Sequence, residues 1–155
     1  MTGKDLCGAA IAIYGSRTSI LIYNTQNNKI EELTLLRMGK NERWIVTNPD
    51  MKIKEDAKLF SPATRAAYEH PKYLELFETY CKKGISIRYS GCFAVDCYQM
   101  FIKGHGVYTL LDSVAHPSRL SLIYRIIPVA FLVEKAGGKT SDTHQSCLDI
   151  VIEGF

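Results

Sequence analysis

The chain has 155 residues, of which 46% are hydrophobic, and it carries a formal net charge of +3. This hydrophobic fraction is ample for a folded core, so the composition excludes a disordered chain. The charge is mild and the basic residues are spread along the sequence, which argues against nucleic acid as a partner.

Cysteine usage and the amino terminus indicate the compartment. The five cysteines include no CxxC pair and no zinc-type spacing, and their odd number is typical of a reducing compartment with free, buried thiols. The first residues lack the basic segment and long apolar stretch of a secretory signal, and the longest apolar segment is too short to span a bilayer. We therefore expect a soluble, cytoplasmic protein without a targeting segment or a membrane partner.

The first 50 residues have the pattern of an antiparallel β-meander. Small, β-branched and aromatic residues predominate in segments that are separated by turns rich in Gly and Asn. The pattern predicts hairpin turns at 24–28 and 38–41, and strands on both sides of Gly15 within 7–23, over 30–36 and around 44–46. A sheet of this kind is marginal alone, so it must pack against another layer.

From residue 53 onward, helical and strand patterns alternate, which is typical of an α/β domain. Ser61 and Pro62 have the residue types of a helix N-cap and a first helical position, and Pro71 begins a second helix that Gly84 ends. The further predicted elements are a strand over 85–89, a helix over 93–102, a strand over 107–111 and a last strand or short helix within 147–152. The predicted fold is a layered α/β/α domain with a mixed sheet, preceded by the β-meander. A boundary near Ile53 gives domains 1–52 and 53–155.

The segment Arg119–Gly138 is the predicted centre of the core, because it is apolar nearly all round a helical projection. The two glycines at its end predict the helix stop, and Pro128 predicts a kink. Arg125 interrupts the apolar surface. Since a guanidinium is rarely buried without a partner, Arg125 either forms a structural ion pair, lies at an edge, or contacts an anion in a pocket.

The clearest candidate site is the order strand, Gly turn, helix at Arg88–Phe93. Free backbone amides and the helix dipole favour an acceptor there, such as a phosphate or a sugar hydroxyl, and Arg88 and Tyr89 add a cation and a phenol. A turn without a ligand is the alternative interpretation. Arg119 and Arg125 are further candidate anion contacts. The four histidines have no metal-ligand spacing, and Cys92 has no histidine close in sequence, so we expect an inert, buried thiol there.

Four stretches, in a characteristic order and spacing, carry a family resemblance: Tyr14–Thr18, Lys58–Pro62, Arg88–Asp96 and Leu122–Gly138. Together they resemble the class I fructose-1,6-bisphosphatases and, more closely, the sedoheptulose-1,7-bisphosphatases, but only their C-terminal half. The resemblance implies that residues 1–52 are the tail of the metal-binding domain and residues 53–155 a sugar-phosphate domain that is incomplete at its C-terminal end. The family reaction is Mg-dependent hydrolysis of the 1-phosphate of fructose-1,6- or sedoheptulose-1,7-bisphosphate, and a plastid becomes an alternative location.

The resemblance also implies a binding site for a sugar bisphosphate or phosphate. The backbone of Gly91, Cys92 and Phe93 matches the family segment that contacts the sugar. Arg88 and Tyr89 match outright, and in relatives this arginine reaches the distal phosphate of a neighbouring subunit, so a homo-oligomer or pairing with a full-length relative is expected.

Three other family positions differ in detail. Arg119 keeps the charge of a family lysine that touches the substrate. The family's phosphate-binding asparagine has no clear match within 61–65, and an asparagine or tyrosine of relatives is matched by Leu110.

The magnesium site is the main departure from the family. The chain lacks the family's Asp-Pro-Leu-Asp-Gly-Ser segment, and the glutamate ligand that follows an aromatic residue in the family is matched by Arg125 after Tyr124. Magnesium needs anionic oxygen ligands, and a guanidinium repels it. We therefore expect no catalytic residue, no metal ligand and no cofactor in this chain, although the family uses magnesium.

Three hypotheses of function follow. The first is a catalytically inactive relative that binds a phosphorylated sugar through Arg88, Tyr89, Arg119 and Arg125. The second is an active phosphatase that is completed by an N-terminal half not in this chain, and the third is a non-catalytic partner of an active relative. The resemblance also predicts poor independent stability, because family segments without a counterpart here would leave strand edges and apolar surface exposed.

Overall fold

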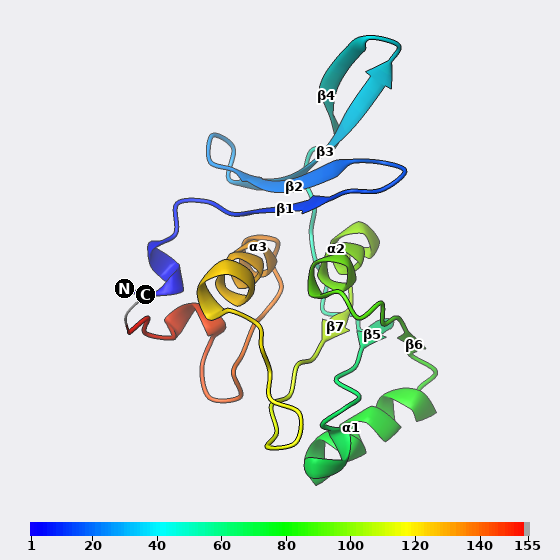
Figure 1. The fold of residues 1–155 in the computed structure, drawn as a ribbon, viewed down its shortest axis with the longest axis vertical. Helices are drawn as coiled ribbons and strands as arrows, with labels where there is room; N and C mark the ends of the chain where they lie inside the picture. Colours follow the sequence, from blue (N-terminus) through cyan, green and yellow to red (C-terminus); the bar gives the residue numbers. More distant parts are fainter. Residues whose placement is uncertain (154–155) are drawn as a thin grey trace. The chain divides into compact units, whose positions relative to one another are not determined.

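The structure, a computed structural model, describes residues 1–153. Two compact units are present: Met1–Lys54 together with Ser121–Phe155, and Glu55–Leu120 (Figure 1). The division of the sequence at residues 52 and 53 stays a prediction. No helix within the described residues is long and apolar enough to cross a membrane.

The first unit contains a four-stranded antiparallel sheet in the order β1-β2-β3-β4, which confirms the predicted meander. Its strands are β1 (Ala10–Ile13), β2 (Ser19–Asn24), β3 (Lys29–Met38) and β4 (Asn41–Asn48). Asn28 and Gly39 lie in the turns with φ of 57° and 63°. These left-handed conformations explain why Asn and Gly occupy the connections.

Helix α3 (Ile127–Lys135) packs on one face of this sheet. The rings of Tyr23 and Phe131 meet edge to face with centroids 5.2 Å apart, and the Lys135 ammonium lies 5.3 Å from the Tyr23 centroid. Leu21 and Ile30 are completely buried on the same face. This face, called here the inner face, therefore holds the apolar core of the unit.

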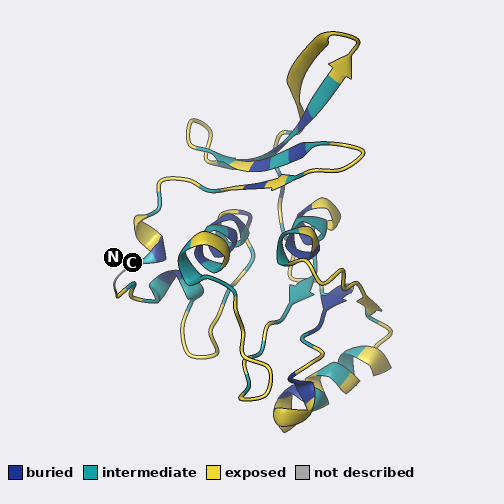
Figure 2. Cartoon of the chain, viewed as in Figure 1, coloured by how far each residue is buried: buried dark blue, intermediate teal, exposed yellow. Residues whose placement is uncertain are grey.

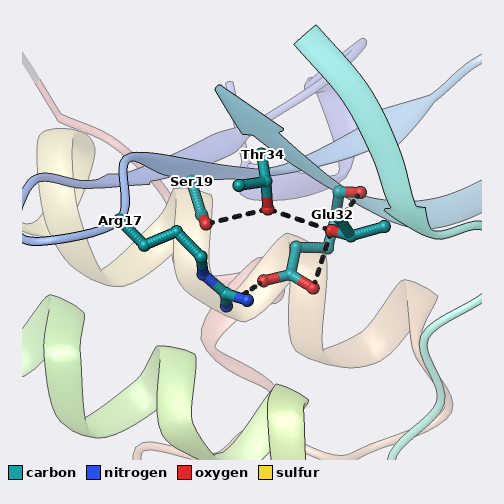
Figure 3. Close-up of polar contacts among 5 residues, drawn as sticks. Arg17, Ser19, Glu32 and Thr34 are labelled. Atoms are coloured by element: carbon teal, nitrogen blue, oxygen red, sulfur yellow. Dashed lines mark hydrogen bonds and ion pairs between the residues drawn. The ribbon is translucent and has the colours of Figure 1, made fainter. Parts of the chain in front are cut away.

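Polar side chains form a connected network at one end of the inner face (Figure 3). Arg17 donates to Glu32 Oε1 at 2.7 Å, and Thr47 donates to Glu32 Oε2 at 3.0 Å. Thr34 joins Thr47 at 3.1 Å and Ser19 at 3.2 Å. Glu32 is only 5% exposed, so its carboxylate requires such partners.

The outer face of the sheet is apolar and exposed. Leu33 pairs with Ile20 on one side and with Val46 on the other, and Leu35 pairs with Trp44. Trp44 is 43% exposed and Val46 52% exposed, and Figure 2 shows β4 as exposed along most of its length. An apolar face of this kind favours association with other surfaces.

The segment predicted as one long α-helix begins with a different helical spacing. Residues Leu122–Ile126 form a π-helical turn, η3, and α3 begins only at Ile127. The Ile126 N–H donates to the Ser121 carbonyl at 3.2 Å, the five-residue spacing of a π turn. The helical residues run without a break from Leu122 into α3, so Pro128, which has no N–H, lies just after the change from π-helical to α-helical spacing. The kink at Pro128 stays a prediction.

The first half of this segment is also more exposed than expected. Tyr124 is 80% exposed and Arg125 is exposed, whereas Phe131 and Leu132 are 4% and 0% exposed. The prediction of a helix buried all round is thus correct for α3 and wrong for η3, because only α3 lies against the sheet.

The second unit contains a three-stranded sheet in the order β6-β5-β7. Its strands are β5 (Leu59–Ser61), β6 (Ser86–Ile87) and β7 (Val107–Tyr108), and both described strand pairs are parallel, whereas the sequence predicted a mixed sheet. Each connection between these strands contains a helix, α1 (Pro71–Lys82) or α2 (Phe93–Lys103), which allows parallel pairing.

Helices α1 and α2 cover opposite faces of this sheet (Figure 1). Phe60 packs on Phe77 and Tyr80 of α1, with ring centroids 6.0 and 4.9 Å apart. Tyr108 packs on Phe93 of α2 at 5.1 Å. Since adjacent residues of a strand point to opposite faces, this confirms the predicted α/β/α layers.

The predicted helix at Ser61 and Pro62 is wrong. Ser61 ends β5, and the next helical residues form the 3-10 turn Ala67–Glu69. Pairing of β5 with two neighbouring strands outweighs the local capping signal. In the first unit, the segment predicted as a last strand or short helix contains the 3-10 turn Cys147–Asp149 and a single bridge between Val151 and Thr2.

All five cysteines are free, as expected, but their burial differs from the prediction. Cys97 is buried and Cys147 partly buried, whereas Cys7, Cys81 and Cys92 are exposed. Cys92 lies in a surface turn before α2 and is therefore not the buried thiol that the sequence suggested.

Phe60 tests the core of the second unit, because it is completely buried between β6, β7 and α1. Phe60→Ala should lower the free energy of unfolding by about 3–5 kcal/mol through the cavity that it leaves. Tyr68→Ala, at a residue 85% exposed, should change it by less than about 0.5 kcal/mol. Urea denaturation followed by circular dichroism measures both, and equal effects would contradict this packing.

The exposed outer face predicts that the isolated chain associates as its concentration rises. Combined Trp44→Gln and Val46→Thr substitutions should reduce association, whereas Tyr124→Gln, at an exposed residue outside the sheet, should not. Light scattering and calorimetry at several protein concentrations provide the measurement. A wild-type protein that stays monomeric and monodisperse at every concentration would contradict the expectation.

Candidate functional site

The candidate site of the second unit lies at the carboxyl edge of its parallel sheet. The strands follow one another as β5, β6, β7 in the chain but as β6-β5-β7 in space, so the two helical connections leave in opposite directions. In open α/β sheets, ligands bind outside the carboxyl ends of the strands, near such a reversal. The segments at this edge begin at Pro62 after β5, Arg88 after β6 and Thr109 after β7.

Arg88 begins the loop that leads from β6 to α2. Its N–H donates to the Phe60 carbonyl at 2.9 Å, and its guanidinium donates to the Ile87 carbonyl at 3.0 Å. The Arg88 side chain is exposed and Tyr89 is 52% exposed, so both can reach a ligand from solvent. Gly91 has φ of 78° with open space where a Cβ would lie, which gives the turn its shape.

Free backbone amides follow at the start of α2. The Cys92 N–H donates to Ser90 Oγ at 3.1 Å, and the first helical bond runs from the Asp96 N–H to the Cys92 carbonyl at 3.0 Å. Within the described residues, the amides of Phe93, Ala94 and Val95 have no acceptor. Together with the helix dipole they can donate to oxygen atoms of a ligand.

A second hydrogen-bond group at the same edge was not found by sequence reasoning. The Ala63 N–H donates to Tyr73 Oη at 2.8 Å and to Thr109 Oγ1 at 3.1 Å, and these two hydroxyls lie 2.7 Å apart. Burial raises the pKa of Tyr73, so the hydroxyl stays protonated. The group joins the segments after β5 and β7 to α1. Its only sequence signal was Tyr73 on the apolar face of a helix, which indicated packing alone.

The structure brings together five of the seven predicted site residues. Arg88, Tyr89, Gly91, Cys92 and Phe93 form one continuous loop and helix start. Sequence adjacency already implied this grouping, and the structure adds the free amides and the exposed side chains.

The other two predicted residues are separate cations. Arg119 is exposed in an irregular segment of the second unit, and Arg125 is exposed in η3 of the first unit. Among residues 1–153, neither side chain forms a hydrogen bond or an ion pair, so the ion pair considered for Arg125 is not formed there.

The residues present do not fit a magnesium ion. In the described part of the chain, no group of three or more His, Cys, Asp or Glu side chains could hold a metal. Magnesium prefers octahedral oxygen ligands with carboxylates among them. Arg125 offers a positive charge where the family resemblance placed a carboxylate.

A family model described as the fructose-1-6-bisphosphatase C-terminal domain matches residues 53–155. The chain belongs to the fructose-1,6-bisphosphatase family. The resemblance seen in the sequence, including its restriction to the C-terminal half, is thereby confirmed.

Individual relatives agree with this assignment. The chain is 37% identical over 153 residues to the chloroplastic sedoheptulose-1,7-bisphosphatase of Triticum aestivum, covering 98% of this chain and 38% of the relative. It is 33% identical to a class 1 fructose-1,6-bisphosphatase of Syntrophotalea carbinolica, covering 99% and 47%. The chain thus spans less than half the length of these curated relatives.

Solved structures of the family have the same fold. A protein of Toxoplasma gondii described as a sedoheptulose-1,7 bisphosphatase superposes with a TM-score of 0.88 at 34% identity, covering 99% of this chain and 48% of that one. The fructose-1,6-bisphosphatase of Leishmania major in apo form gives 0.83 at 26% identity, covering 98% and 49%. The predicted α/β fold of a sugar bisphosphatase is confirmed by both.

Cys97, on the buried side of α2, should make the stability of the protein depend on pH. Burial raises the pKa of its thiol from 9.0 to about 12, so the thiol ionises in the unfolded chain before it ionises in the folded one. Its contribution to stability is complete below pH 9.0 and is lost as the pH rises towards about 12. The free energy of unfolding should fall by up to about 1.4 kcal/mol per pH unit in this range.

Cys97→Ala should make this fall shallower, whereas Cys81→Ala, at an exposed thiol, should not. Urea denaturation between pH 8 and 11, on the order of six points per variant, measures the slope independently of any loss of packing. Identical slopes in the three proteins would contradict the burial of this thiol.

Proposed function

We propose that this chain is a sugar-bisphosphatase relative that binds a phosphorylated sugar and does not hydrolyse it by itself. The observation that carries the proposal is the loop Arg88–Phe93, where an exposed guanidinium and phenol precede the free amides of α2. Family membership supports the choice of a sugar bisphosphate or phosphate as the ligand.

Different parts of this loop would bind the phosphate and the sugar of the ligand. A guanidinium forms strong, charge-assisted hydrogen bonds with phosphate, so Arg88 would hold a phosphate group with Tyr89 beside it. The amides of Phe93–Val95 would donate to sugar oxygens. Arg119, which is exposed in the same unit, would add long-range attraction for an anion. Arg125, which is exposed in the first unit, stays a predicted anion contact.

Metal-dependent hydrolysis is left out of the proposal because the residues present do not fit magnesium. Two-metal phosphoryl transfer requires anionic ligands that hold the ions against the phosphate. Arg125 and the absence of a ligand cluster within residues 1–153 both argue against such a site in this chain.

An active phosphatase completed by an N-terminal half not in this chain is the second candidate. It is favoured by the length of the relatives, which carry more residues outside the matched region than within it. Such pairing, a homo-oligomer, or a non-catalytic role beside a full-length relative would also supply a neighbouring subunit for Arg88. Cytoplasm or plastid is the proposed location, because the relative of Triticum aestivum is named as chloroplastic.

Calorimetric titration with fructose-1,6-bisphosphate and with sedoheptulose-1,7-bisphosphate tests ligand binding. Arg88→Gln should weaken binding at least about tenfold, since a charge-assisted hydrogen bond contributes on the order of 1.5–3 kcal/mol. Arg43→Gln, which removes an exposed guanidinium from β4, should leave the affinity unchanged. Absence of heat and of a thermal shift at millimolar ligand would leave only the role of an interaction partner.

A phosphatase assay with and without magnesium tests the absence of hydrolysis. The purified chain should release no more phosphate with magnesium than in the metal-free control, because the residues present do not fit the ion. Turnover above that control would overturn this part of the proposal. Turnover that appears only after addition of a separately expressed N-terminal half of a relative would favour the second candidate.

A further inference from the structure

We propose that Asp96 is a positioning residue, which shapes the loop Ser90–Phe93 and keeps the first turn of α2 selective for neutral hydroxyl groups over phosphate. The inference rests on the proposed function for its ligand, a phosphorylated sugar, and assigns a part of that ligand to this turn. The role of Asp96 in shaping the loop can be tested without any ligand.

Asp96 holds the loop from inside the second unit. It is the fourth residue of α2 and only 4% exposed, and its Oδ1 accepts the Ser90 N–H at 2.9 Å. Ser90 Oγ in turn accepts the Cys92 N–H at 3.1 Å. The two bonds enclose Gly91, so the carboxylate determines how the chain turns from β6 into the helix.

The second oxygen of this carboxylate is unused. Asp96 Oδ2 is buried and has no hydrogen-bond partner among the described residues, and no Lys, Arg or His in that part of the chain forms an ion pair with it. A buried carboxylate oxygen without a partner is costly. Since this oxygen has no accessible surface, a ligand cannot bond it directly, and the negative charge acts through space on the amides at the start of α2.

The groups that face Asp96 do not compensate its charge. They are the Cys97 thiol on α2 and the Tyr108 phenol on β7. Burial is the main cause that raises the pKa of both groups, so both stay neutral near pH 7. The Asp96 carboxylate adds to the rise at Cys97, and Cys97 followed by Asp96 adds to it at Tyr108. The negative charge therefore lowers the positive potential that the helix start would otherwise offer to an anion.

We infer from these observations that two parts of the loop receive different parts of the ligand. Exposed Arg88 attracts the phosphate, and the amides of Phe93–Val95 beside Asp96 receive the uncharged part of the sugar. Specificity then comes from repulsion as well as attraction, because the carboxylate disfavours phosphate in the first turn.

Three variants separate shape from charge. Asp96→Asn keeps Oδ1 as an acceptor for the Ser90 N–H and removes the charge, and Asp96→Ala removes both. Glu75→Gln is the matched control, because it removes an exposed carboxylate from α1 in the same unit.

Amide hydrogen exchange, measured residue by residue by NMR, reports the shape. The Ser90 and Cys92 amides should exchange at least about tenfold faster in Asp96→Ala and near the wild-type rate in Asp96→Asn and Glu75→Gln. Unchanged exchange at Ser90 in a folded Asp96→Ala protein would overturn the positioning role. Fast exchange at Ser90 in Asp96→Asn would also overturn it, which keeps the test decisive if the alanine variant does not fold.

Titration with inorganic phosphate reports the charge. Chemical shifts of the amides at 93–95 should saturate at a several-fold lower phosphate concentration in Asp96→Asn than in wild type or Glu75→Gln. Equal phosphate affinity in all three proteins would overturn the selectivity. Fructose-1,6-bisphosphate, titrated in parallel into wild type, separates this outcome from failure of the proposed function: without any shift the proposed function fails, while Ser90 exchange still decides the positioning role.

Discussion

Strand β5 is the constraint on which the organisation of the second unit depends. It lies between β6 and β7, and its alternating side chains serve two layers: Phe60 packs on α1, and Ser61 faces the layer of α2. The Phe60 carbonyl also accepts the Arg88 N–H at 2.9 Å, which places the candidate loop directly beside the strand. The packing of the core and the position of the candidate loop therefore both depend on the three residues of β5.

The proposed function, ligand binding without hydrolysis, depends on charge at two places in the chain. The loop Arg88–Phe93 offers an exposed cation, an exposed phenol and free amides, which suit the phosphorylated sugar of the proposal. The position where the family resemblance placed a carboxylate for magnesium holds the exposed guanidinium of Arg125. The proposed binding and the family's hydrolysis would depend on different residues, so one could persist in a chain without the other.

Local signals predicted most of the fold. Turn residues and alternation located the meander, and Pro71, Gly84 and Gly91 marked the ends of α1 and the start of α2. Ser61 was misread because its capping residue type is a local signal, whereas its place in β5 depends on strands more than 20 residues away. The π turn was missed because Ser121 and Pro128 have the residue types of an ordinary helix start and do not indicate a π-helical spacing.

For the site, the sequence predicted one continuous loop but not the network behind it. Adjacent residues such as Arg88 and Tyr89 share a loop in any fold, so their grouping required no tertiary information. The Ala63 amide, the Tyr73 hydroxyl and the Thr109 hydroxyl meet only through the order of the parallel strands. Asp96 likewise gains its role through a backbone amide six residues earlier, a contact that no residue-type pattern indicates.

The most direct test of this account is an anomalous diffraction measurement on crystals of the chain soaked in manganese, a substitute for magnesium. The account predicts no ordered ion beside Arg125, because a guanidinium repels a divalent cation and carboxylate ligands do not gather in the described part of the chain. An anomalous peak beside Arg125 with oxygen ligands at metal-binding distances would contradict it.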